Sequence, residues 1–258
     1  MAKNSAARFD LEHLNAASVE ACDRALRTIA AGAESRQEAA ARVVNFFYEC
    51  FEQPSTGKSA CVLARCFQTC SYALLPLDYQ HAADRILESL PEQPSAHDEM
   101  RCLALLATHG ERSLWNDPRT SVGHQAIPLP SAEFVEQAPM ISRLMKQLGV
   151  PIHRLITAPG EGSLLLEELP REFNVFHIPK ALGSPFIPGQ ANFVVPFGVQ
   201  SAVGMGGPLP DGQLFAVVIF SRVPVSREVA TFFRTLAASV RQALEPFPVA
   251  KTFAGSVG

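Results

Sequence analysis

Apolar and polar positions alternate most regularly between residues 193 and 203, where nearly every odd position is apolar. A period of two predicts a strand with one buried face. Pro196 has no N–H to donate, so we expect it at a sheet edge or a bulge. Residues 208–212, Pro-Leu-Pro-Asp-Gly, have the composition of a tight turn. The continuous apolar run at 214–220 then predicts a strand covered on both faces.

Helical periodicity marks the end of the chain. After Ser226, apolar residues recur every three or four positions from Val229 to Leu244, and arginines occupy the opposite side. Ser226 is a favourable N-cap, and Glu228 lies in the first turn, where a negative charge stabilises a helix. We therefore predict a C-terminal amphipathic helix.

Two more helices are predicted near the start of the chain. Ser35 and Glu38 form a capping box in front of an apolar stripe that reaches Phe51. Asp10 is expected to cap an earlier helix that runs to about Ala31.

The pattern between these helices is mixed. Strands are predicted at 60–67, 101–107, 152–156 and 164–166, and helices at 79–90 and 131–148, the latter interrupted by Pro139 and ended by Gly149. Two long irregular connections, 109–130 and 179–190, separate the elements. Because helices lie mainly at the two ends with strands between them, an α+β fold is favoured over a parallel α/β sheet.

The C-terminal segment resembles the last hairpin and closing helix of a GAF domain. The residues that carry this resemblance are NFVVPFGVQSAVGMGGPLPDGQLFAVVIFSRVPVSREVATFFRTLAASVRQAL. More closely, the chain resembles the N-terminal sensory regions of bacterial hybrid histidine kinases, through LWNDPRTSVGHQAIPLPS, QAPMISRLMKQLG and FNVFHIPKALGSPFIPGQ as well. Those relatives usually continue into PAS and kinase modules. The resemblance implies a GAF-like antiparallel sheet flanked by N- and C-terminal helices, in a signalling context.

This resemblance suggests the division of the chain. We expect a tail and helix at 1–34, a GAF-like sensory domain at 35–248 and a C-terminal tail at 249–258. The family implies no ligand and no catalytic residues that can be transferred to this sequence.

Composition narrows the classes of function. The chain has 258 residues, of which 47% are hydrophobic and 18% charged, so it can bury a sizeable core. Its formal charge of -3 and lack of a basic run argue against nucleic acid as a partner. No apolar stretch approaches the length of a membrane span, and the first residues lack the apolar region of a signal peptide. We expect a cytoplasmic protein with reduced cysteines.

Known catalytic and metal-binding motifs are missing. Gly57-Lys58-Ser59 resembles the end of a phosphate-binding loop, but Glu52 stands where that motif needs its first glycine. The cysteines near Cys66 and Cys70 have no second pair elsewhere with zinc-ligand spacing. Buried, unreactive thiols are therefore the simpler interpretation, and a redox enzyme or thiol switch built on Cys66 or Cys70 is the alternative.

A ligand pocket is expected beneath the long connections, because such connections are often functional. Its predicted lining combines large apolar side chains with two histidines. The residues are Trp115, His124, Met140, Met145, Phe176 and His177. The alternative is an ordinary core under a long loop. The cofactor is unknown from sequence, although His124 or His177 has the chemistry of an axial haem ligand.

The leading interpretation is a non-catalytic sensory domain that binds a small molecule or cofactor and signals through its terminal helices. We expect a homodimer that pairs through those helices, with a histidine kinase or another signalling protein as a further partner. A ligand-free dimerisation scaffold remains a third interpretation.

Overall fold

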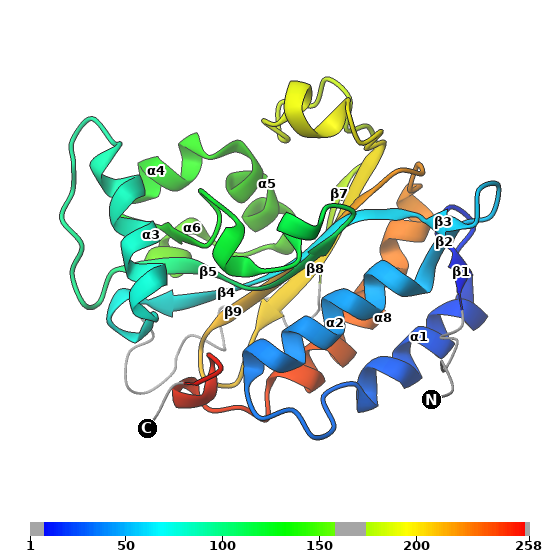
Figure 1. Ribbon diagram of the computed structural model, residues 1–258, viewed down its shortest axis with the longest axis horizontal. Helices are drawn as coiled ribbons and strands as arrows, with labels where there is room; N and C mark the ends of the chain where they lie inside the picture. The colour runs from blue at the N-terminus through cyan, green and yellow to red at the C-terminus, as the bar shows by residue number, and fades with distance from the viewer. Residues whose placement is uncertain (1–7, 158–173, 256–258) are drawn as a thin grey trace.

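The computed structural model describes residues 8–157 and 174–255 and contains a six-stranded antiparallel sheet (Figure 1). Its strands lie in the order β6-β5-β4-β9-β8-β7. Their bounds are β4 (Cys61–Ser71), β5 (Arg101–Gly110), β6 (Ala126–Pro128), β7 (Val175–Ile178), β8 (Ser201–Pro208) and β9 (Leu214–Ser221). The two central strands, β4 and β9, are buried along most of their length, as apolar runs of this kind require.

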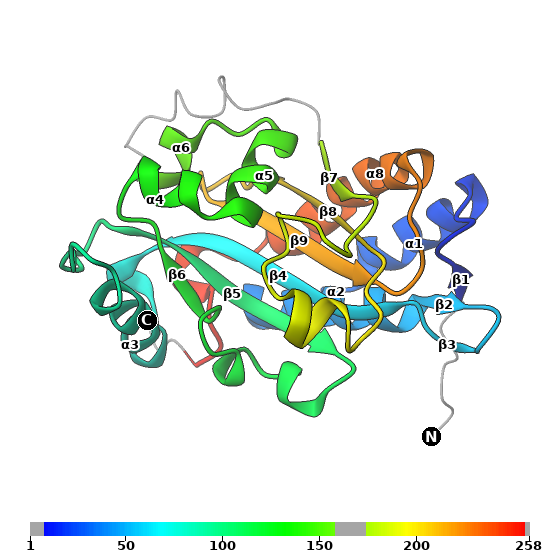
Figure 2. The same ribbon diagram turned by 90° about the horizontal axis from the view of Figure 1, so that it is seen from above.

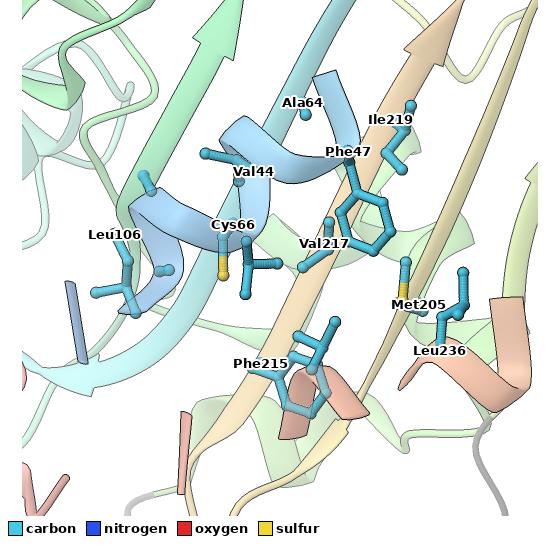
Figure 3. Packing of buried hydrophobic residues seen from close by; sticks show 14 of the residues in the cluster. Val44, Phe47, Ala64, Cys66, Leu106, Met205, Phe215, Val217, Ile219 and Leu236 are labelled. Atoms are coloured by element: carbon cyan, nitrogen blue, oxygen red, sulfur yellow. The ribbon is translucent and has the colours of Figure 1, made fainter. Parts of the chain in front are cut away.

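Three helices cover one face of the sheet. They are α1 (Ala16–Thr28), α2 (Arg36–Cys50) and α8 (Arg227–Leu244). Helix α2 packs over β4 and β5, α8 packs over β7 and β8, and α1 lies against α8 (Figure 1). Figure 3 shows the core beneath these helices, where Phe47 and Leu236 point toward Val217 and Met205 of the sheet. We call this layer the helix-face core.

The opposite face is covered by shorter elements and by the long connections (Figure 2). These elements are α4 (Ala132–Gln137), α5 (Pro139–Leu148), α6 (Ile152–Ile156) and the π-helix η4 (Gln190–Val194). Their apolar side chains pack on inward-facing residues such as Leu105, Phe176 and Val218. We call this layer the connection-face core.

Smaller elements complete the described chain. A three-stranded sheet is formed by β1 (Phe9–Asp10), β2 (Phe51–Gln53) and β3 (Lys58–Ser59), and α3 (Leu77–Glu88) packs beside the edge strand β6. Short 3-10 helices are η1 (Tyr72–Leu74), η2 (Ser113–Trp115), η3 (Pro118–Thr120) and η5 (Val249–Lys251). No helix in the described ranges is long and apolar enough to cross a membrane.

The expected α+β class is confirmed, as are an antiparallel sheet and terminal helices on one of its faces. The local signals for α2 and α8 are also correct. The hydroxyl of Ser35 accepts from the N–H of Glu38, and that of Ser226 accepts from the N–H of Val229. Gly149 ends α5 in the left-handed conformation with φ 74°, which glycine adopts without strain.

The predicted strand at 193–203 is wrong over its first half. Residues 190–194 form η4, and strand β8 begins only at Ser201. Phe193 and Phe197 are four residues apart, so they fit a helical face as well as a strand face. Both rings pack on Trp115, with centroid distances of 5.6 Å and 4.6 Å, and this nonlocal contact favours the helical turn.

Two other predictions need correction. Residues 152–156 form α6 and not a strand, because Ile152, Leu155 and Ile156 have helical spacing and Leu155 is fully buried. The first helix begins at Ala16 with Asn15 as its N-cap. The side chain of Asp10 instead accepts from the main-chain N–H of Glu12, in the turn between Asp10 and the helix. The predicted strand at 164–166 lies outside the described residues.

Candidate functional site

A cation lies on the connection-facing surface of the central sheet. Arg65 of β4 pairs with Thr108 of β5 and with Val218 of β9, whereas its neighbours Ala64 and Cys66 belong to the helix-face core. Arg65 is partly buried, and burial lowers the pKa of its guanidinium to about 10, so it remains charged near neutral pH. Its Nε is buried without a hydrogen-bond partner. Among the described residues, Arg65 has no salt bridge to a carboxylate.

Two buried hydroxyl groups, one beside Arg65 and one in the 109–130 connection, are also without partners among the described residues. Thr108 is 4% exposed and Ser121 is 5% exposed, and neither Oγ forms a hydrogen bond in the structure. The N–H of His124 donates to the carbonyl of Ser121 at 3.0 Å, which closes a tight turn. Buried polar groups are normally satisfied, so these unpartnered hydroxyls call for an explanation.

His124 stands at the exposed side of this group. Its side chain is exposed, and Nδ1 lies 3.2 Å from the carbonyl oxygen of Val122. The protein around the ring lowers the pKa of His124, and the positive charge of Arg65 lowers it further. His124 is therefore neutral near neutral pH, and one ring nitrogen can donate a hydrogen bond.

An aromatic cluster borders the polar group. Trp115 lies directly over Gly110 of β5, since a methyl group there would be 2.9 Å from the indole Cε3. Gly110 and Thr108 are two residues apart on one strand face, a separation of roughly 7 Å. Phe193 connects the cluster to the sheet, with its centroid 5.6 Å from Trp115 and 5.0 Å from Phe220. The connection-facing side of the sheet thus carries an aromatic cluster near Arg65, with its rings packed edge to face.

The six residues predicted to line a pocket are not all brought together. Trp115 and His124 flank the Arg65–Thr108 pair, as described above. Met145 and Phe176 are buried in the connection-face core, and Met140 is partly buried at its margin. These three fit the alternative of an ordinary core beneath the connections.

His177 lies on the other face of the sheet from Phe176, because adjacent strand residues point in opposite directions. Its Nε2 is 2.8 Å from the carbonyl oxygen of Val225, just before α8. Its main-chain N–H and C=O are both bonded by the side-chain amide of Gln147. His177 and His124 therefore do not share a site, and His177 Nε2 already has a partner.

The predicted thiols are deeply buried. Cys66 is 0% exposed and Cys70 is 2% exposed. Burial raises the pKa of the Cys66 thiol to about 12 and that of Cys70 to about 11. Four residues of strand separate them by roughly 13 Å, which is too far for a disulfide. Cys61 shares their face, contrary to the simple alternation, because a bulge lies between Cys61 and Leu63.

A hollow lies at the other long connection, 179–190. It has a volume of about 440 Å³ and lies between α5 and residues 178–186. Arg143 and Lys180 line it, and the guanidinium of Arg143 lies 4.9 Å from the Phe186 ring centroid. The described residues contain no group of three or more histidine, cysteine, aspartate or glutamate side chains placed to hold a metal ion.

One feature of the sequence distinguishes Arg65. Arg65 is the single charge in the apolar strand segment CVLARCF. Charged residues are rarely placed in a covered strand without a partner or a function. Thr108 carries no such signal, since only strand register places it beside Arg65.

Comparison with known proteins gives little further guidance. No protein-family model matches the chain, and no curated protein matches it in sequence. Among solved structures, the chain is similar to the chromophore-binding domain of an unusual bacteriophytochrome from R. palustris. That similarity has a TM-score of 0.38 at 14% identity and covers 89% of this chain and 62% of that one. A likeness this weak assigns neither a ligand nor an activity.

Proposed function

We propose that this chain is a non-catalytic, GAF-like sensory domain that binds a small molecule beneath the 109–130 connection. The observation that carries the proposal is the Arg65–Thr108 pair on β4 and β5, where neither the Arg65 Nε nor the Thr108 hydroxyl has a hydrogen-bond partner among the described residues. Ligand sites combine an apolar lining with a few placed polar groups. Trp115 supplies the apolar part here.

In this proposal the terminal helices transmit the signal. Strand β4 presents Arg65 to the connections and Cys66 to the layer formed by α1, α2 and α8. A ligand that binds one arrangement of the connections better than another shifts the population of that arrangement. The helix layer also provides the surface for the proposed homodimer and for a histidine kinase or similar partner.

The thiol alternative has less support. The thiolate is the reactive form, and a thiol with a pKa of 11 or 12 is almost entirely protonated near neutral pH. Haem ligation through His177 is likewise disfavoured by its bond to Val225. A ligand-free scaffold would leave the unpartnered groups around Arg65 without a role.

Native mass spectrometry of freshly purified protein tests the proposal. We expect a retained small molecule whose mass is lost on unfolding, and Trp115 emission that changes when the released molecule is added back. His124→Ala should weaken this binding while changing the free energy of unfolding by less than about 1 kcal/mol, as for a non-core substitution. Protein that carries no extra mass, or a retained molecule whose affinity is unchanged in His124→Ala while the melting temperature falls, would reject the proposal.

A further inference from the structure

The polar side chains in the region of Arg65 favour one class of ligand. They comprise one permanent cation, two hydroxyls and a neutral imidazole, and no carboxylate contacts Arg65 within the described part of the chain. Arg65 and the two hydroxyls can donate hydrogen bonds, whereas the single N–H of neutral His124 is directed to the Val122 carbonyl. A group that accepts several hydrogen bonds and carries negative charge would satisfy them together.

The contrast with Arg36 shows what a satisfied buried arginine looks like in this fold. Arg36 donates to the carboxylate of Asp211 at 2.8 Å, to the Gln68 side chain at 3.0 Å and to two main-chain carbonyls. Arg65 has none of these contacts. Among the described residues no carboxylate pairs with Arg65, so its guanidinium is available to an anionic group of a ligand.

The aromatic cluster limits the shape of the remaining part of the ligand. The indole of Trp115 lies on the same strand face as Thr108, and its edge packs against Phe197 at a centroid distance of 4.6 Å. Flat apolar groups pack well on such surfaces.

We propose that Arg65 and Thr108 bind an oxyanion, a carboxylate or a phosphate, beneath the connection that carries Ser121 and His124, and that the flat apolar part of the ligand packs on Trp115. This inference rests on the proposed sensory function and names the class of its ligand. Arginine binds either oxyanion through two parallel hydrogen bonds, so the geometry fits both.

Calorimetric titration with three probes that share one ring tests the inference. Benzoate and phenyl phosphate carry the two oxyanions, and benzamide is the neutral control. We expect both anions to bind. The anion with the lower dissociation constant shows whether the site prefers a carboxylate or a phosphate. Benzamide should bind about tenfold more weakly or worse, since hydrogen bonds to charged groups are the stronger ones.

Three variants locate the binding. Arg65→Gln should weaken both anions about tenfold or more and leave benzamide unchanged. Arg24→Gln is the matched control, because it removes the same charge from an exposed site on α1 and should change no affinity. Thr108→Val should weaken the anions without lowering the melting temperature, since the hydroxyl it removes has no partner in the structure.

Benzamide that binds as tightly as benzoate, or Arg65→Gln that leaves benzoate binding unchanged, would overturn the oxyanion inference. The two proposals fail in different ways. A retained neutral molecule that binds independently of Arg65 rejects the oxyanion and leaves the sensor. Benzoate binding that requires Arg65, in a protein that retains nothing and whose Trp115 emission never responds, keeps the anion site and rejects the sensor.

Discussion

Replacing Arg36 with methionine should be among the most destabilising single changes in this protein. Arg36 begins α2, is 1% exposed, and connects three parts of the fold. Its guanidinium donates to the carbonyl of Leu244 at the end of α8 and to that of Phe247 just after it. It also donates to Gln68 of β4 and to Asp211 in the β8–β9 turn. Methionine fills part of the volume and makes none of these bonds.

The magnitude follows from what the substitution leaves behind. Breaking a buried ion pair by removing one partner typically costs about 3–5 kcal/mol. Gln68 is 1% exposed and would lose the hydrogen bond to its oxygen, which contributes about 1–3 kcal/mol of that total. The Asp211 side chain is 20% exposed and can recover water, so we expect the lower half of the range, about 3–4 kcal/mol.

Equilibrium unfolding in urea, followed by circular dichroism, measures this change. The midpoint should fall with an unchanged slope, and the melting temperature should drop by roughly 6–16 °C for a chain of this size. Asp211→Asn should cost less, because its amide oxygen still accepts a hydrogen bond. Arg24→Met serves as the control, since its exposed pair with Glu20 should contribute under about 1 kcal/mol. A loss below about 1 kcal/mol for Arg36→Met would refute the reasoning.

Four further measurements examine the remaining conclusions. Phe233→Ala should cost about 3–5 kcal/mol in urea unfolding because this ring is fully buried, and partly buried Phe232→Ala should cost clearly less. Burial lowers the pKa of His177 from 6.5, so the unfolded chain binds this proton more readily; stability should be full above about pH 6.5 and fall as the pH drops through the folded-state pKa. His177→Gln should flatten that dependence, and an unaltered slope would exclude His177 as its source. Cys66 and Cys70 should stay reduced when native protein is treated with peroxide, as judged by alkylation and mass spectrometry; rapid oxidation would restore the thiol alternative. Light scattering should report a homodimer at high micromolar concentration, and monomer alone would count against pairing through the terminal helices.

The elements that could be predicted from sequence are those fixed by local chemistry. Helices α2 and α8 begin at serines whose hydroxyls cap the first turn, and both carry one apolar stripe. The turn at 208–212 and strand β9 are similarly local. Each of these signals lies within a few neighbouring residues, so no knowledge of the tertiary fold is needed.

The errors arose where distant contacts decide the structure. Phe193 and Phe197 fit a strand or a helical turn equally well, and only their packing on Trp115 selects the turn. Short apolar runs such as 152–156 are ambiguous between strand and helix for the same reason. A single bulge beside Cys61 reverses the face on which it lies.

The connection containing Trp115 and His124 was expected to border a ligand, and this stays a prediction. The structure places Trp115 over Gly110, and it places His124 close enough to Arg65 for the guanidinium charge to lower the pKa of the imidazole. Arg65 itself was not predicted, because its significance depends on strand register and on the absence of a described carboxylate partner. His177 was grouped with Phe176 by proximity in sequence, whereas strand alternation separates them onto opposite faces.

Strand β4 is the shortest physical route between the proposed ligand and the helices. Arg65 faces the connections, Cys66 packs in the helix-face core, and Gln68 three residues further on bonds to Arg36 at the start of α2. Arg36 in turn bonds to the carbonyl of Leu244 at the end of α8. Because closely packed cores respond to small displacements as units, a shift of β4 caused by a ligand at Arg65 would reach both helices. A signal carried this way requires no movement of the outer strands β6 and β7, so hydrogen exchange in α2 and α8 should respond to ligand more strongly than exchange in those strands.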